Sequence, residues 1–135
     1  MTRYMIAVDG SDHSDKAYDI AKKLCREGDV VYFVTVTKKV RDNDGEDSAN
    51  YKQREHAKEL LQTWEKRAGD DGIQSQTVLV EAPDAREALC DVAEEHTIDV
   101  MVVGTRGLGT IKRLFLGSVS SYCVQHAKCD VLVAK

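Results

Sequence analysis

Five short apolar segments, each separated from the next by a stretch with helical periodicity, restrict the fold of this chain more than any other feature. The segments are rich in β-branched and aromatic residues and are apolar along their whole length. Strands of this kind are buried on both faces, and strands that alternate with helices pair in parallel. The sequence therefore predicts an α/β fold, an open five-stranded parallel sheet with helices on both faces, whose strands are residues 3–8, 30–36, 76–80, 99–103 and 131–134.

The segments between the strands predict helices and one polar loop. A long amphipathic helix is expected to begin at Tyr51, and Asp84 is expected to cap the next helix. The loop at about 38–50 is acidic, but Tyr51 stands where the calcium loop of an EF-hand needs a glutamate. We therefore expect a single domain over residues 1–135 with a flexible, solvated loop at 38–50.

Polar or glycine residues follow three of the predicted strands. Asp9 follows the first strand, Thr37 the second, and Gly104 opens a glycine-rich loop after the fourth. In parallel α/β sheets, ligands bind at the carboxyl ends of the strands, where the winding of the chain reverses. These three positions are therefore the candidates for a binding site.

The glycine loop is followed by a helix that opens on Gly117, Ser118 and Ser120. Glycines let backbone N–H groups approach an anion closely, and a helix N-terminus adds free donors and a partial positive charge. The loop is not a Walker A motif, because Thr110 stands where lysine is required, and it also lacks the dinucleotide-binding fingerprint. The pattern favours a phosphate site, and a simple glycine-rich turn is the alternative.

Composition excludes several classes of protein. The formal net charge of -4 argues against a nucleic-acid-binding protein, which usually presents a basic face. No stretch approaches the roughly 18 apolar residues of a membrane span, and the N-terminus lacks a signal-peptide pattern. The four cysteines have no zinc-site spacing, and free thiols are typical of a reducing compartment. We expect a cytoplasmic protein without nucleic-acid or membrane partners.

Three segments of the chain resemble the universal stress protein family. They are Ile6–Ser11, Asp99–Gly104 with the following Gly-x2-Gly-x9-Gly-Ser motif, and the tail from Ser120 to Val133. The glycine motif is similar to that of the ATP-binding branch of the family. The resemblance implies a Rossmann-like sheet of the adenine nucleotide α-hydrolase-like type, with strand order 3-2-1-4-5. It also implies a homodimer, in which an otherwise exposed apolar edge strand pairs with its copy through Val131, Leu132 and Val133.

The resemblance further implies an ATP site. Asp9 would lie near the ribose and phosphates and help to hold Mg²⁺ or Mn²⁺, and a turn or helix-capping role is its alternative. Arg106 would pair with phosphate oxygens or, in the alternative, face solvent. The first two strands would line the adenine pocket, Val103 and Gly104 would pass beside the nucleoside, and the rest of the glycine motif would surround the phosphates. The implied cofactor-binding residues are Ala7, Val8, Asp9, Val36, Val103, Gly104, Arg106, Gly107, Gly117, Ser118, Val119 and Ser120.

These implications predict an ATP-binding universal stress protein that acts as a nucleotide-dependent regulatory or stress-response factor. A slow ATP-hydrolysing or phosphotransfer enzyme is the second hypothesis, although the sequence shows neither a dedicated general base nor a P-loop lysine. A phosphorelay receiver domain is the third, but it needs an aspartate after the third strand, where this chain has Glu81. A dimeric scaffold whose glycine loop stays empty is the fourth.

Overall fold

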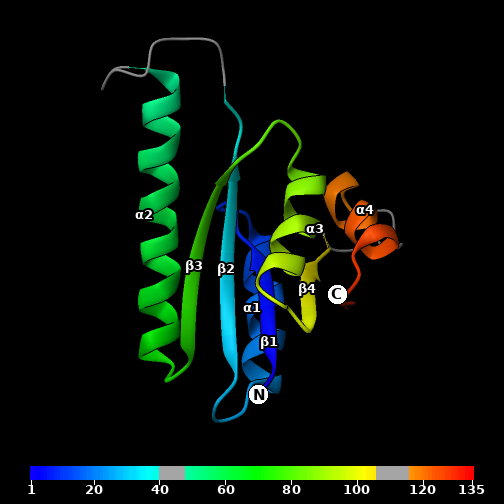
Figure 1. Cartoon of the computed structure of the whole chain (residues 1–135). Helices are drawn as coiled ribbons and strands as arrows, with labels where there is room; N and C mark the ends of the chain where they lie inside the picture. Colours follow the sequence, from blue (N-terminus) through cyan, green and yellow to red (C-terminus); the bar gives the residue numbers. More distant parts are fainter. Residues whose placement is uncertain (40–47, 106–115) are drawn as a thin grey trace, which may run out of the picture.

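The computed structural model of the chain describes residues 1–39, 48–105 and 116–135. Strands and helices alternate along it (Figure 1). The strands are β1 (Arg3–Ala7), β2 (Val30–Thr37), β3 (Gln74–Glu81), β4 (Val100–Gly104) and β5 (Asp130–Ala134). The helices are α1 (Asp12–Leu24), α2 (Ala49–Asp70), α3 (Ala85–Glu95) and α4 (Ser118–His126).

The strands form one parallel sheet in the order β3-β2-β1-β4-β5. This confirms the predicted α/β class and the implied strand order. β3 is longer than predicted because all of its residues, from Gln74 to Glu81, pair with β2 although the first ones are polar. The order also argues against a receiver domain, because flavodoxin-like sheets have the order 2-1-3-4-5 and place the third strand inside the sheet. Here β3 is an edge strand.

Two hydrophobic clusters cover the two faces of the sheet. On the face covered by α1 and α2, the rings of Tyr18, Phe33 and Trp64 are in contact, with centroids 5.3 to 5.9 Å apart. On the opposite face, residues of α3 and α4 pack against the sheet, where Met101 of β4 belongs to the same cluster. Phe33 and Val34 are successive in β2 and belong to different clusters, as the two-residue period of a strand requires. Every residue of β2 except Val36 is therefore buried between two layers of helices.

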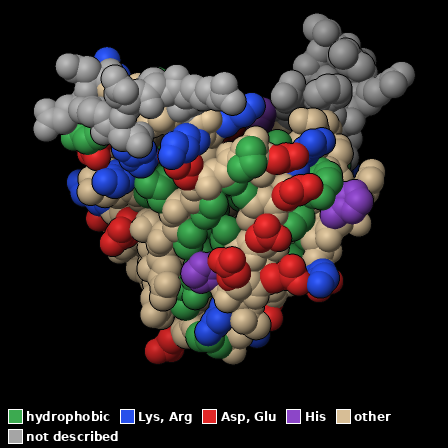
Figure 2. All heavy atoms as spheres, turned by 45° about the horizontal axis from the view of Figure 1, so that its top comes forward, with side chains coloured by type: hydrophobic (Ala, Val, Ile, Leu, Met, Phe, Trp, Pro, Cys, Tyr) green, Lys and Arg blue, Asp and Glu red, His purple; other side chains and the backbone are tan. Residues whose placement is uncertain are grey.

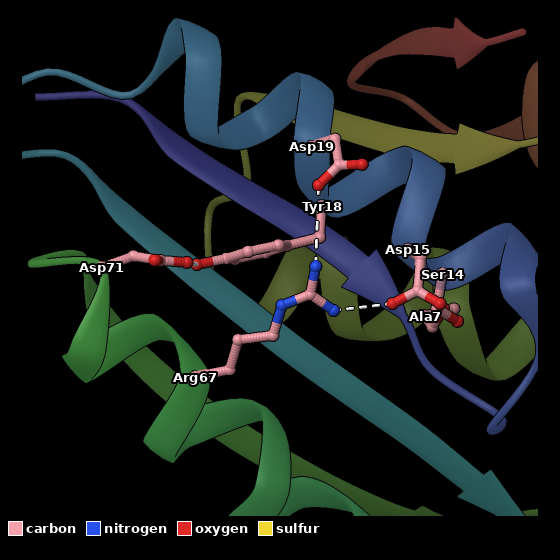
Figure 3. A network of polar contacts seen from close by, with 7 residues as sticks. All are labelled: Ala7, Ser14, Asp15, Tyr18, Asp19, Arg67 and Asp71. Carbon is pink, nitrogen blue, oxygen red and sulfur yellow. Dashed lines mark hydrogen bonds and ion pairs between the residues drawn. The ribbon is translucent and has the colours of Figure 1, made fainter.

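A polar network joins the C-terminal half of α2 to α1 (Figure 3). The Arg67 guanidinium donates to Asp15 at 2.6 Å and lies 3.6 Å from Asp19. It also lies over the Tyr18 ring, 4.6 Å from the ring centroid. The Tyr18 hydroxyl donates to Asp71 at 2.5 Å, and burial together with this hydrogen bond raises the pKa of Tyr18. Paired charges thus supplement the aromatic contacts that hold α2 in place.

Helix α2 begins at Ala49, two residues before the start predicted at Tyr51. The Ser48 side chain accepts a hydrogen bond from the Tyr51 backbone N–H at 3.0 Å, so Ser48 caps the helix. The predicted loop at 38–50 therefore ends at Ser48, and residues 40–47 of it lie outside the described part of the chain. Among the described helices, none is both long and apolar enough to span a membrane.

Candidate functional site

The sheet has a step at the carboxyl ends of its strands. β1 ends at Ala7, which pairs with Val34, whereas β2 continues to Thr37. The Val34 carbonyl accepts a hydrogen bond from the Val8 N–H at 2.9 Å. Since backbone groups two residues apart on a strand point the same way, the N–H and C=O of Val36 face the space beyond the end of β1.

A cavity of about 570 Å³ lies at this step, within the usual size range of small-molecule sites. Figure 2, in which this end of the sheet comes forward, shows hydrophobic side chains at the surface between the α2 side and the α3 side. Arg106 and Gly107, two of the twelve predicted site residues, lie outside the described part of the chain. The other ten all line the cavity: Ala7, Val8, Asp9, Val36, Val103, Gly104, Gly117, Ser118, Val119 and Ser120.

Asp9 has a structural role at the mouth of the cavity. Its Oδ1 accepts a hydrogen bond from the Ser11 backbone N–H at 2.9 Å, which closes an Asx turn between β1 and α1. Gly10 has a φ of 86° in this turn, a conformation that glycine adopts without strain. The turn role that the sequence left open is therefore present, and Asp9 also lines the cavity as an exposed side chain.

Gly104 is required by packing. A methyl group on its Cα would lie 2.7 Å from the carbonyl carbon of His13 and closer still to the carbonyl oxygen. The first turn of α1 therefore approaches the end of β4 more closely than any side chain at Gly104 would allow. The sequence predicts this glycine as part of the nucleotide-binding motif, beside the nucleoside, and the contact with His13 adds a packing requirement at the same position.

The N-terminus of α4 faces the same cavity. Gly117 is the N-cap residue, and the first helical residues, Ser118, Val119 and Ser120, line the cavity. The first turn contains no acidic residue, and the first hydrogen bond of the helix runs from the Ser121 N–H to the Gly117 carbonyl. The N–H groups of the preceding residues have no partner within the helix, so this end of α4 suits an anion.

Comparison with known proteins identifies the family of this chain. The model of the universal stress protein family matches residues 1–135. The chain belongs to the universal stress protein family. The universal stress protein YxiE of Bacillus subtilis (strain 168) is 29% identical to this universal stress protein, in an alignment that covers 98% of each chain.

Solved structures of other universal stress proteins share the fold. A universal stress protein from Archaeoglobus fulgidus in complex with dAMP matches 100% of this chain and 98% of its own, with a TM-score of 0.78 and 22% identity. A universal stress protein family protein from Arabidopsis thaliana with AMP bound matches 100% of this chain and 92% of its own, with a TM-score of 0.76 and 22% identity. At this identity the likeness shows the common fold.

This universal stress protein has cavity residues that the sequence did not assign to the site. Ser11 and Thr37 are notable because, in the described part of the chain, their hydroxyl oxygens are the buried side-chain oxygens without a hydrogen-bond partner. Thr37 was already a strand-end candidate in the sequence, whereas Ser11 was not. The α2 residues were not identifiable, because their place depends on how that helix packs on the sheet. The unassigned lining residues include Ser11, His13, Thr35, Lys38, Gln53, His56, Leu60, Leu89 and Cys123.

The α3 and α4 side of the cavity is apolar in this universal stress protein. Cys123 is 1% exposed, and burial, with lesser contributions from Cys90 and Cys129, raises the pKa of its thiol to about 12. The thiol therefore stays protonated and behaves as a small apolar group. Leu89 and Val119 line the cavity on the same side. This wall suits the flat apolar face of a ligand.

Proposed function

We propose that this universal stress protein binds ATP, with Mg²⁺ or Mn²⁺ on its phosphates, and acts in the cytoplasm as a nucleotide-dependent regulatory or stress-response factor. One observation carries the proposal: a single cavity brings the strand-end residues together with the free backbone amides of α4. The relatives with bound AMP and dAMP support an adenine ligand. The free cysteines support a reducing compartment. A nucleotide regulates such a protein by binding one of its conformations more tightly than another.

In this proposal the nucleotide lies across the ends of the strands. The backbone N–H and C=O of Val36 face the space beyond β1 and offer a donor and an acceptor to the edge of a base. Ala7 and Val8 line the cavity beside them, and Val103 and Gly104 line it at the end of β4. The nucleoside then occupies the middle of the cavity, with its phosphates toward α4.

The phosphates would bind at the N-terminus of α4. Backbone N–H groups of Ser118, Val119 and Ser120 and the hydroxyls of the two serines are donors of the kind that phosphate oxygens accept. Arg106 and Gly107 belong to the same motif and are assigned to the phosphates by sequence alone. The charge of the triphosphate is partly balanced by the positive end of the helix dipole.

The binding of a divalent cation would require ligands from both the nucleotide and the protein. In residues 1–39, 48–105 and 116–135, no group of three or more acidic, histidine or cysteine side chains is arranged to hold a metal ion. Mg²⁺ commonly binds through one or two carboxylates together with phosphate oxygens. Asp9 is the carboxylate at the cavity, so it fits the role of single protein ligand beside the phosphates. The cation would neutralise phosphate charge.

The variant Gly117→Val tests the phosphate site. The added side chain would occupy the space in front of the free N–H groups of α4, so we expect affinity for ATP with Mg²⁺ to fall at least about tenfold. Titration calorimetry of the wild type and the variant measures the difference. Gly69→Ala is the control, because a methyl group at Gly69 meets no atom within 4 Å and lies in the last turn of α2. An absence of heat from the wild type at millimolar ATP would contradict the proposal.

We also propose a homodimer through β5. Among the described residues this strand pairs only with β4, and Val131, Leu132 and Val133 are partly exposed along it. An apolar edge strand of this kind is a template for pairing with another chain, whereas the other edge, β3, carries exposed polar residues along its first half. Sedimentation equilibrium should give twice the 15.0 kDa mass of the chain. A monomer at micromolar concentration would contradict this assignment.

A further inference from the structure

Thr37, the last residue of β2, carries a hydroxyl without a hydrogen-bond partner in the described part of the chain. The residue is 8% exposed and lines the cavity. Two positions earlier on the same strand, the Thr35 hydroxyl donates to the Val8 carbonyl at 2.9 Å. A hydroxyl that loses water without gaining a partner destabilises the folded state. Thr35 thus stabilises the fold, whereas the hydroxyl of Thr37 destabilises it.

The side chain of Thr37 lies on the face of the sheet that α1 and α2 cover. The two-residue period of the strand places it with Phe33 and Thr35 on that face. On this side of the cavity α2 contributes Gln53 and His56. An amide, an imidazole and a hydroxyl each offer hydrogen-bond donors and acceptors, which suits the edge of a heterocycle.

The direction of the neighbouring backbone indicates which part of a ligand reaches this region. The N–H and C=O of Val36 face the space beyond β1, and Thr37 follows directly in sequence. A planar base held against Val36 therefore brings its polar edge next to Thr37. Rotation about the Cα–Cβ bond exchanges the hydroxyl and methyl groups of a threonine, so the hydroxyl can turn toward a ligand without backbone movement.

We propose that Thr37 is a specificity-determining residue whose hydroxyl accepts a hydrogen bond from the exocyclic amino group of an adenine-like base, with Gln53 and His56 enclosing that end of the ligand. The inference rests on the proposed nucleotide-binding function and deepens it. It also explains why a buried hydroxyl without a partner is kept at this position, since the ligand supplies the missing hydrogen bond. The phosphates remain at α4, on the other side of the cavity.

The variant Thr37→Val tests the inference because valine has nearly the same shape and lacks only the hydroxyl. Affinity for AMP, measured by titration calorimetry, should fall about tenfold. The melting temperature without nucleotide should stay the same or rise, because an unsatisfied group is removed. Thr37→Ser keeps the hydroxyl and should retain most of the affinity. Wild-type affinity in Thr37→Val would overturn the inference.

Changing the ligand provides the second half of a double-mutant cycle. Purine riboside 5′-monophosphate lacks the amino group that AMP carries and is otherwise the same. The wild type should bind AMP about tenfold more tightly than this analogue. In Thr37→Val this ratio of affinities should fall by about the same factor as the affinity of the variant for AMP. An undiminished preference in the variant would show that Thr37 does not contact the amino group.

The same measurements separate this inference from the proposed function. If the wild type binds neither AMP nor ATP, both fail together. If the wild type binds AMP and Thr37→Val binds it equally well, the nucleotide site stands and only the role of Thr37 is lost. Thr35→Val is the control for the effect of a threonine-to-valine change on stability, because it removes a hydroxyl that already donates to the Val8 carbonyl. Its melting temperature should fall, in the opposite direction to that of Thr37→Val.

Discussion

Replacing Gly104 with alanine should lower the free energy of unfolding by about 3 kcal/mol or more, the upper end of the overpacking range. The new methyl group would overlap the backbone carbonyl of His13, and a backbone atom cannot turn aside as a long side chain can. Either α1 or β4 must move, although β4 is an inner strand of the sheet and α1 packs against it. Since domains of this size are stable by only about 5–15 kcal/mol, urea unfolding followed by circular dichroism should detect the loss clearly.

The control for this experiment is again Gly69→Ala, which places the same methyl group in open space. Alanine is a better helix former than glycine, so this variant should be as stable as the wild type or more stable by up to about 1 kcal/mol. An unchanged urea midpoint in Gly104→Ala would show that α1 does not lie against β4 as described. The result also bears on the glycine motif, because a loss of nucleotide binding in Gly104→Ala would then reflect the fold rather than a phosphate contact.

Trp64→Ala should destabilise the protein by about 3–5 kcal/mol. The Trp64 side chain is 6% exposed, stacks on Phe33 with ring centroids 5.3 Å apart, and meets the edge of Tyr18. Arg67 lies over its ring, 4.8 Å from the centroid. Truncation would leave a large cavity between α2 and the sheet and would remove the aromatic part of the attachment of this helix.

The matched control is Trp64→Phe, which keeps an aromatic ring in the cluster and should lose less than half as much stability. Both variants are measured by urea unfolding. Helix α2 also carries Gln53 and His56 at the cavity. Trp64→Ala should therefore weaken nucleotide binding in proportion to the fraction of molecules that are unfolded and have lost this wall of the cavity. A stable Trp64→Ala protein would show that the ion pairs around Arg67 hold α2 without the indole ring.

The fold was predictable because each strand contains a run of apolar residues and the helices between the strands are amphipathic. The sequence also identified Asp84 as the cap of α3, and its side chain accepts from the Arg86 N–H in the structure. Strand order came from the family resemblance alone, since nothing in one sequence states which strands are neighbours. The start of α2 was placed two residues late, because the capping role of Ser48 within a polar run has no distinctive signal.

The site was predictable where the sheet itself creates it. Asp9, Thr37 and Gly117 lie at the ends of strands or at the start of a helix, and parallel strands bring such positions to one edge. Val36 was named only through the family resemblance. Gln53 and His56 could not be predicted, because they reach the cavity only through the packing of α2 some distance away. Gly104 was predicted as part of a binding motif, and its packing against His13 could not be predicted, since a close approach between two backbones leaves no trace in sequence that differs from a phosphate loop.

The Asx turn at Asp9 limits how this protein can interact with a metal ion. One carboxylate oxygen already accepts the hydrogen bond that holds the chain between β1 and α1, so the other oxygen is the better placed to meet the proposed ion from outside. A cation with one point of attachment to the polypeptide is bound chiefly by the phosphates beside it. The ion should therefore enter and leave as part of the nucleotide complex, and dialysis that removes nucleotide should remove the metal in equal amount.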